Sequence, residues 1–155
     1  MSGNSGAGEN PVQSKIQEDV AARGWSWIWV FDPDEKSSPF AYTIGFGTTF
    51  GHPEVVVAGL PEGTSEGVLS AVHAELENGA VFSDGDVSDE VLEAFKVRFR
   101  VVPVDLLPGS LGQAVEFYGG RNFEAVQLYW PDRDGNFPGD EDASAWLNER
   151  QSLRP

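Results

Sequence analysis

The chain has 155 residues, with 25 Asp and Glu against 10 Lys and Arg, and its formal net charge is −15. This excess of acids argues against nucleic acid and anionic membrane as partners, because phosphate binding needs clustered Lys and Arg. The chain has no cysteine, which excludes disulfides, thiolate nucleophiles and Cys-ligated zinc. No apolar run approaches the roughly 20 residues that span a bilayer, and the N-terminus lacks the basic start and apolar core of a secretory signal. We therefore expect a soluble, cytoplasmic protein.

Residues 1–10 are small and polar, and we expect them to form a disordered tail ahead of a single globular domain over 11–155. The first predicted element of that domain is a helix over Pro11–Arg23, since its apolar residues lie four apart on one face. Gly24 then supplies the stop that is common after a helix.

Two strands are predicted next, joined by a turn-rich loop at 32–39. In the first, over 25–31, aromatic residues alternate with Ser, Ile and Val, which is the period of a strand with two different faces. The second, over 41–46, alternates in the same way, and we expect the two strands to be antiparallel neighbours. Tyr42 is expected on the side of the sheet that carries the tryptophans.

A glycine-rich loop follows and leads into a continuous β-branched run at 55–57, which suits a strand buried on both faces. Three glycines within 45–51 free the loop backbone to take positive φ. Pro53 fixes its own φ and pushes the preceding His52 into an extended conformation. Binding groups tend to lie on loops that rigid strands hold in place, so this loop is a candidate for a functional site.

The second half of the chain adds three helices and further strands. The first of these is a helix from Thr64 or Ser65 to Asn78-Gly79, followed by a strand at 80–82, a brief turn at 91–92 and an amphipathic strand over 95–104. The next helix begins with the capping box Ser110-x-x-Gln113 and ends at Gly119-Gly120. A strand over 124–130 and a terminal helix over 143–151 complete the chain. Neighbouring strands early in the chain favour an α+β fold: one domain whose mainly antiparallel or mixed sheet packs against about three to four helices.

The candidates for chemistry lie around the glycine-rich loop. His52 and Glu54 are two residues apart, so they point the same way along an extended chain, and a His–Glu pair can act as a base with its orienting group. Tyr42 completes the candidate catalytic residues. The alternative for His52 is a loop residue that hydrogen-bonds nearby backbone. The predicted ligand-binding residues, which combine an aromatic wall with directional polar contacts, are Trp25, Trp27, Tyr42, Thr43, His52 and Gln127.

No metal site is predicted. The acids at 132–142 suggest a calcium loop, but an EF-hand loop that started at Asp132 would need Gly at its sixth position and Glu at its twelfth. The chain has Phe137 and Ala143 there. We interpret the Asp and Gly residues of this segment as turn residues.

Several of these motifs resemble one bacterial family. The residues that carry the resemblance are Gly24-Trp25, Tyr42-Thr-Ile-Gly45, Gly51-His-Pro-Glu54, the apolar run that ends at Gly59-Leu60, and Gln127 with Pro131-Asp132, Gly135 and Phe137-Pro138. Together they are similar to the family called domain of unknown function 4262, over residues 12–140. The resemblance implies that the motifs at 42–54 and 127–138 belong to one domain and lie near each other. It implies no activity, substrate or cofactor, and Gly139 departs from the family pattern, which usually has Trp after Phe-Pro.

These observations favour a protein with an aromatic-lined pocket that binds an organic small molecule, without a cofactor, and that could act as an auxiliary or tailoring enzyme. The alternative is an acidic protein–protein interaction module, such as an immunity or adaptor protein, which a basic protein partner would recognise. A homodimer is also left open. A metal-dependent hydrolase that uses His52 and Glu54 with His73 or Asp132 is the third and weakest hypothesis.

Overall fold

The computed structural model describes residues 10–120 and 122–153. The tail expected over 1–10 therefore lies outside the described residues, except for Asn10. The side chain of Asn10 accepts hydrogen bonds from the backbone N–H groups of Val12 and Gln13. Asn10 is thus the N-cap of the first helix, because it satisfies two of the N–H groups that a helix start leaves unpaired.

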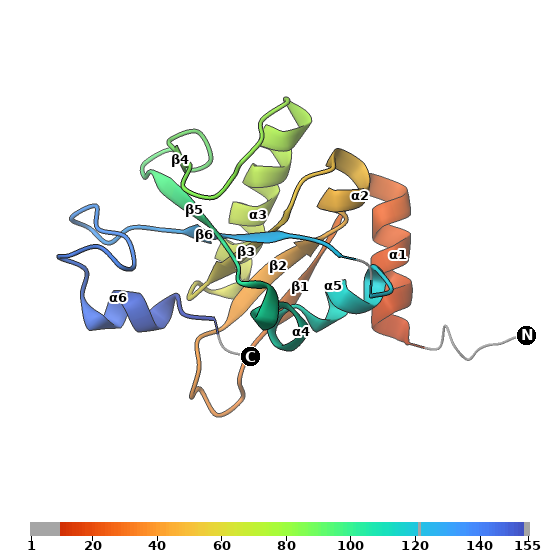
Figure 1. The fold of residues 1–155 in the computed structure, drawn as a ribbon, viewed down its shortest axis with the longest axis horizontal. Coiled ribbons are helices and arrows are strands. Elements are labelled where there is room, and N and C mark those ends of the chain that lie inside the picture. The colour runs from red at the N-terminus through yellow and green to blue at the C-terminus, as the bar shows by residue number, and fades with distance from the viewer. Residues whose placement is uncertain (1–9, 121, 154–155) are drawn as a thin grey trace, which may run out of the picture.

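A six-stranded mixed sheet forms the centre of the molecule (Figure 1). Its strands are β1 (Ser26–Val30), β2 (Phe40–Ile44), β3 (Glu54–Ala58), β4 (Val87–Ser88), β5 (Val97–Val101) and β6 (Ala125–Tyr129). They lie in the order β1-β2-β3-β6-β5-β4, and every neighbouring pair is antiparallel except the parallel pair β3 and β6. The predicted α+β class is therefore confirmed.

Six α-helices and one 3₁₀ helix accompany the sheet in the described part of the chain. They are α1 (Pro11–Arg23), α2 (Phe46–Phe50), α3 (Glu62–Glu77), η2 (Val104–Leu106), α4 (Leu107–Ser110), α5 (Gly112–Phe117) and α6 (Ala145–Arg150). The predicted helices correspond to α1, α3, the α4–α5 segment and α6. Among the described residues, no helix combines the length and the apolar character that a membrane span requires.

The helices cover both faces of the sheet. Helix α3 packs over one face, where its apolar residues meet Ala41, Val55 and Val57 of the central strands. Helices α1, α4 and α5 cover the other face, where Ile16 and Leu111 join Val56. Figure 1 shows α1 and α5 side by side at one end of the molecule and α6 at the other. Two hydrophobic cores result, one on each side of the sheet.

The register of β1 and β2 corrects the expected position of Tyr42. Trp27 lies opposite Thr43, and Ile28 lies opposite Tyr42. Because successive strand residues point to opposite faces, Trp27 and Trp29 pack on the α3 side while Tyr42 packs on the side of α1 and α5. The prediction that Tyr42 shares a side with the tryptophans is therefore wrong.

The glycine-rich loop contains a short helix that the sequence pattern does not reveal. The strand expected over 41–46 ends at Ile44, because Gly45 takes φ 111° and turns the chain into α2. Gly51, with φ 65°, ends that helix one turn later. Glycine tolerates this left-handed region without the steric cost that a Cβ would add.

Three other expected elements differ in the structure. Residues 80–82 pair with no strand, and the backbone N–H of Phe82 bonds a side chain instead. The strand expected over 95–104 is limited to Val97–Val101. The capping box at Ser110 is not formed, because Ser110 is the last residue of α4 and α5 begins after Leu111 without a side-chain cap.

Candidate functional site

Glu54, the first residue of β3, is a buried carboxylate that five donors surround. The residue is 1% exposed. The donors are the hydroxyl of Thr43 at 2.7 Å, the backbone N–H groups of Gly45, Phe46 and Gly47 at 3.1 to 3.2 Å, and the hydroxyl of Tyr118. We call this group the Glu54 cluster. It joins β2, α2, β3 and the end of α5 through one side chain.

The cluster explains why the tight α2 turn forms. A helix start leaves its first N–H groups without backbone partners, and the Glu54 carboxylate accepts three such groups. Burial raises the pKa of Glu54, and the hydrogen bonds from Tyr118 and Thr43 offset part of that rise. Burial and the neighbouring Glu54 charge raise the pKa of Tyr118 as well, so its phenol stays protonated and donates.

Both ring nitrogens of His52 contact backbone groups. Nδ1 lies 2.7 Å from the carbonyl oxygen of Pro53, and Nε2 lies 2.9 Å from the backbone nitrogen of Phe82. Since a carbonyl can only accept and an N–H can only donate, Nδ1 carries the proton and Nε2 accepts. Burial lowers the pKa of His52 and thereby favours this neutral form. This geometry fits the alternative in which His52 tethers the loop to the segment after α3.

Gln127, a predicted ligand-binding residue, lies in a second buried network. Its amide nitrogen donates to the carbonyl oxygen of Gln151 at 2.6 Å. The Gln151 side chain in turn exchanges two hydrogen bonds with the backbone of Trp130. These contacts attach the segment after α6 to strand β6, and they occupy the amide nitrogen of Gln127.

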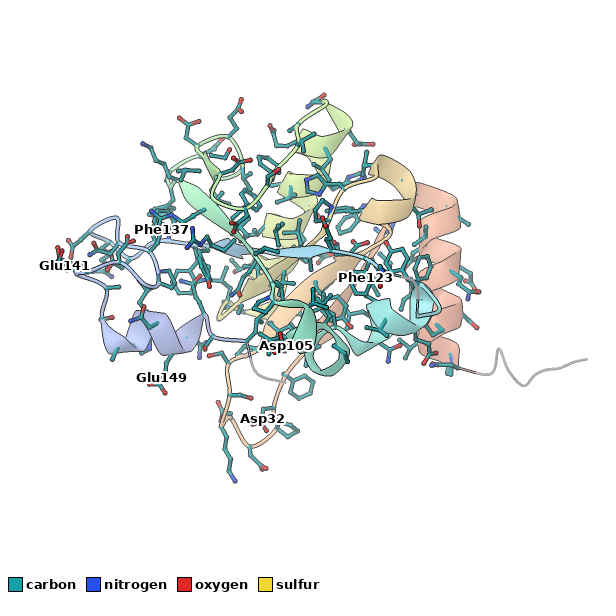
Figure 2. The ribbon with its side chains drawn as sticks, viewed as in Figure 1. Asp32, Asp105, Phe123, Phe137, Glu141 and Glu149 are labelled. Atoms are coloured by element: carbon teal, nitrogen blue, oxygen red, sulfur yellow. The ribbon has the colours of Figure 1, made fainter. Side chains whose placement is uncertain are left out.

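A pocket of about 400 Å³ lies beside the Glu54 cluster. We call it the loop pocket. It is lined by the loop at 51–54, by Gly47 and Thr48, by Tyr118 and by residues 122–124. The ring of Phe123, labelled in Figure 2, stacks on Tyr118 with centroids 5.0 Å apart. His52 and Glu54 belong to the lining of this pocket, but both residues are buried. Their polar atoms already bond protein groups and are not turned to a ligand.

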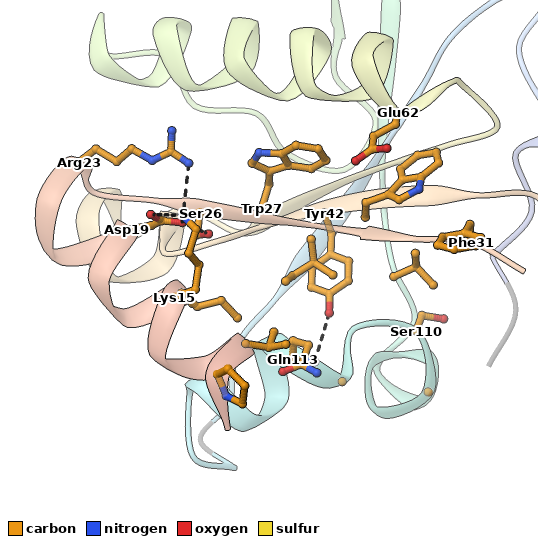
Figure 3. A pocket seen from close by; sticks show the side chains of 18 residues that line it. Lys15, Asp19, Arg23, Ser26, Trp27, Phe31, Tyr42, Glu62, Ser110 and Gln113 are labelled. Atoms are coloured by element: carbon orange, nitrogen blue, oxygen red, sulfur yellow. Dashed lines mark hydrogen bonds and ion pairs between the residues drawn. The ribbon is translucent and has the colours of Figure 1, made fainter. Parts of the chain in front are cut away.

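A larger hollow of about 900 Å³ lies at the β1 end of the sheet. We call it the α1–β1 groove. Six consecutive residues, 26–31, line it along the strand, and Figure 3 shows α1 and the α4–α5 segment around its other sides. The side chains that helix α1 contributes lie on one face and include Val12, Lys15, Ile16, Asp19 and Arg23. This volume falls within the range of roughly 300–1,000 Å³ that is usual for ligand sites.

Polar groups converge on the apolar lining of the groove. The hydroxyl of Tyr42 accepts a hydrogen bond from the backbone N–H of Gln113 at 3.1 Å (Figure 3). Burial raises the pKa of Tyr42 to about 12, so this hydroxyl stays protonated. Asp19 accepts hydrogen bonds from Lys15 and from the hydroxyl of Ser26. The Lys15 hydrogen bond lowers the pKa of Asp19, which is therefore held as a carboxylate.

The predicted site residues do not meet in one place. Trp27 and Tyr42 line the α1–β1 groove, whereas His52 and Glu54 line the loop pocket. Trp25 is a core residue that stacks on His73, with ring centroids 5.1 Å apart. Thr43 is buried in the Glu54 cluster, where its hydroxyl also accepts the N–H of Val55, and Gln127 lies in the network at Gln151.

The sequence pattern does not indicate that Tyr118 or the charged residues of α1 belong to these sites. Tyr118 looks like an ordinary apolar residue of a helix, and only the fold brings it to Glu54. The α1 residues that line the groove include Lys15, Asp19 and Arg23, which read as an exposed helix face. Lys15 and Arg23 are each four residues from Asp19, a spacing typical of surface ion pairs.

The acidic segment after β6 is a turn in the structure. The Asp132 carboxylate accepts hydrogen bonds from the backbone N–H groups of Asp134 and Asn136, and Asp140 accepts from Phe137 and Arg98. Phe137 and Glu141 mark this loop in Figure 2. Within residues 10–120 and 122–153, no three His, Asp or Glu side chains are grouped so that they could hold a metal ion.

Comparison with known proteins gives one match. The family model described as domain of unknown function (DUF4262) matches residues 19–144. No curated protein and no solved structure matches the chain. The match spans both motif regions of the resemblance, at 42–54 and 127–138. The structure brings them close together, because strand β3, which begins at Glu54, pairs with strand β6, which contains Gln127.

Proposed function

The chain belongs to the family of domain of unknown function 4262, and we propose that this member is a binding domain whose α1–β1 groove takes an organic ligand. The observation that carries the proposal is the composition of the groove. Apolar side chains of β1 and α1 line a volume of about 900 Å³, and the Tyr42 hydroxyl and charged α1 side chains border it. A mostly apolar concavity with a few placed polar groups is the usual anatomy of a ligand site.

The contacts of the loop pocket support the choice of the groove. A base or a binding group needs a polar atom that can turn to a ligand. In the loop pocket, both nitrogens of His52 and both oxygens of Glu54 are engaged by protein groups. In the groove, Lys15 and Arg23 also pair with Asp19, but their side chains are 70% and 49% exposed, so a ligand can reach them.

The proposal concerns binding rather than catalysis. Asp19 is the carboxylate that α1 contributes to the groove. The hydrogen bond from Lys15 lowers its pKa and keeps it ionised, and it also accepts a hydrogen bond from Ser26. A general base works best with a pKa near the operating pH, and a lowered pKa moves Asp19 away from that condition.

A ligand screen with a matched pair of variants tests the proposal. Val12 lines the groove and is 43% exposed, whereas Val87 on the far edge strand β4 is 51% exposed. Both are replaced with Phe, so that the same bulk is added to each surface. Quenching of the tryptophan fluorescence, to which Trp27 and Trp29 of the groove contribute, is measured against a panel of amino acids, aromatic carboxylates and heterocyclic metabolites.

We expect at least one panel compound to bind the wild-type chain, and Val12→Phe to weaken that binding by at least tenfold, about 1.4 kcal/mol. Val87→Phe should bind as the wild type does. Equal affinity of the two variants, or no binding by any compound, would refute the proposal.

A further inference from the structure

Strand β1 lies at one edge of the sheet. It pairs with β2 alone among the described strands. In an antiparallel pair, the N–H and C=O groups of alternate residues point to the partner and those of the residues between point away. The outer edge of β1 therefore presents a row of backbone donors and acceptors without a strand partner in the described part of the chain.

Nothing within β1 blocks this edge. Natural proteins protect edge strands with Lys, Pro or bulges, and the sequence of Ser26–Val30, Ser-Trp-Ile-Trp-Val, contains neither Lys nor Pro. The register with β2 is continuous over all five residues, which leaves no bulge. The next residue, Phe31, is 61% exposed. Such an edge favours the addition of another strand.

The groove follows this edge rather than one face of the sheet. Its lining includes six consecutive residues, 26–31, although alternate side chains point to opposite faces. Trp27 stands on one side of the strand in Figure 3 and Tyr42 on the other. A ligand in the groove therefore meets side chains on both faces with the backbone edge between them, which is the environment of an added strand.

The ends of the groove differ in charge. Helix α1 passes into β1 through only Gly24 and Trp25, so the helix and the strand meet at the Ser26 end and diverge from there (Figure 3). Lys15 and Arg23 lie at this corner, with Asp19 as their shared carboxylate. Two cations against one acid leave a positive charge where α1 meets β1. Glu62 lies toward the other end of β1 in Figure 3.

We infer that the ligand of the groove is the C-terminal segment of a partner polypeptide, which adds to β1 as an antiparallel strand. This inference rests on the proposed function of the groove and names its ligand class. An antiparallel strand places its C-terminal end beside Ser26, so a free C-terminal carboxylate lies near Arg23 and Lys15. Its alternating side chains contact Trp27 and Trp29 on one face, and Ile28 and the apolar residues of α1 on the other.

The length of the segment follows from the strand. Five paired residues of β1 extend about 17 Å, at about 3.4 Å per residue. A partner segment of about five residues therefore fills the edge. Main-chain hydrogen bonds would supply sequence-independent affinity, and pockets for alternate side chains would supply specificity.

Binding of a peptide library tests the inference. The probes are random heptapeptides with a free C-terminus. Each selected sequence is also made in two further forms. One ends in a C-terminal amide, and the other carries an Asp as its last residue before the amide, so that the carboxylate lies on a side chain. Affinity is measured for the wild type, for Arg23→Gln and for Arg133→Gln, a control that removes the same charge from the exposed loop after β6. Hydrogen exchange of the β1 amides is followed with and without the best peptide.

We expect apolar peptides with a free C-terminal carboxylate to bind. The C-terminal amide and the amidated Asp peptide should bind at least tenfold more weakly. Arg23→Gln should lower the affinity for the free-carboxylate peptide at least fivefold, whereas Arg133→Gln should leave it unchanged. Amides within 26–30 should gain protection. Peptides that bind equally well as amides, or that leave those amides unprotected, would overturn the inference. If no peptide binds while a small molecule binds in a manner that depends on Val12, the peptide class is wrong and the proposed function stands. If neither binds, both fail.

Discussion

The hydroxyl of Tyr118 donates a hydrogen bond to the carboxylate of Glu54, which lies 64 residues earlier in the chain. This contact joins the end of α5 to the start of β3, and the same carboxylate holds the first turn of α2. The His-Pro-Glu motif therefore stabilises the fold through a buried polar cluster. Its residues do not need a ligand to explain their placement.

Replacing Tyr118 with Phe should destabilise the fold without creating a cavity. The variant removes one donor from a buried carboxylate, and a hydrogen bond to a charged group contributes about 1.5–3 kcal/mol. We expect the free energy of unfolding, measured by urea denaturation, to fall by about 2 kcal/mol. The control is Tyr129→Phe, because Tyr129 lies on β6 away from Glu54. Equal stability of the two variants would contradict the account of the Glu54 cluster.

Replacing His52 with Ala should cost roughly 1–3 kcal/mol of stability, because it leaves the buried N–H of Phe82 without an acceptor. Ligand affinity of the folded protein should stay unchanged, since His52 does not line the α1–β1 groove. Both quantities are measured on one sample, by denaturation and by ligand titration. A stable variant with lost affinity would show that His52 is a binding residue after all.

The pH dependence of stability should carry a contribution from His52. Burial lowers its folded pKa below the ordinary value of 6.5. The unfolded chain therefore binds the proton more readily, so this contribution is fully present above pH 6.5 and is lost as pH falls through the folded pKa. His52→Gln removes the titrating group, and we expect its stability to decline less than that of the wild type from pH 7 to 5. Parallel curves for the two proteins would refute this contribution.

Replacing Glu35 with Gly should stabilise the loop between β1 and β2. Glu35 is the one non-glycine residue in the described chain with positive φ, at 55°. The left-handed region costs an L-residue roughly 1–2 kcal/mol, and the greater unfolded-state entropy of Gly offsets part of that gain. We expect an increase of up to about 1 kcal/mol in the free energy of unfolding. Asp34→Gly, one residue earlier and without positive φ, should lower stability instead, and a rise in both variants would contradict the argument.

The sequence predicted the fold class because its local signals agree with the tertiary structure. The alternation over 25–31, the apolar spacing within Pro11–Arg23 and the β-branched run at 55–57 all appear as the expected elements. Local patterns failed where a backbone N–H group donates a hydrogen bond to a side chain that is distant in sequence. Helix α2 depends on Glu54, and residues 80–82 stay unpaired because the N–H of Phe82 bonds His52.

The candidate groove could be predicted only in part. Trp27 is predicted as part of an aromatic wall and Tyr42 as a directional polar contact, and both line the groove. Its other sides come from α1 and α5, which are neighbours in space although the two segments lie about 100 residues apart, as the contact of Gln13 with Gln113 shows. No local pattern encodes that approach. Thr43 and Gln127 are predicted polar contacts, but both are buried. The Thr43 hydroxyl bonds the Glu54 carboxylate and the N–H of Val55, and the Gln127 amide nitrogen bonds the carbonyl oxygen of Gln151.

The most direct test of the claim that function lies in the groove is amide hydrogen exchange of the wild-type chain, with and without a compound or peptide that binds it. The account predicts that protection increases at residues 26–30 and at Gln113, whose N–H faces Tyr42 in the groove. Protection confined to residues 47–54 and 122–124 would place the ligand in the loop pocket and would contradict the account.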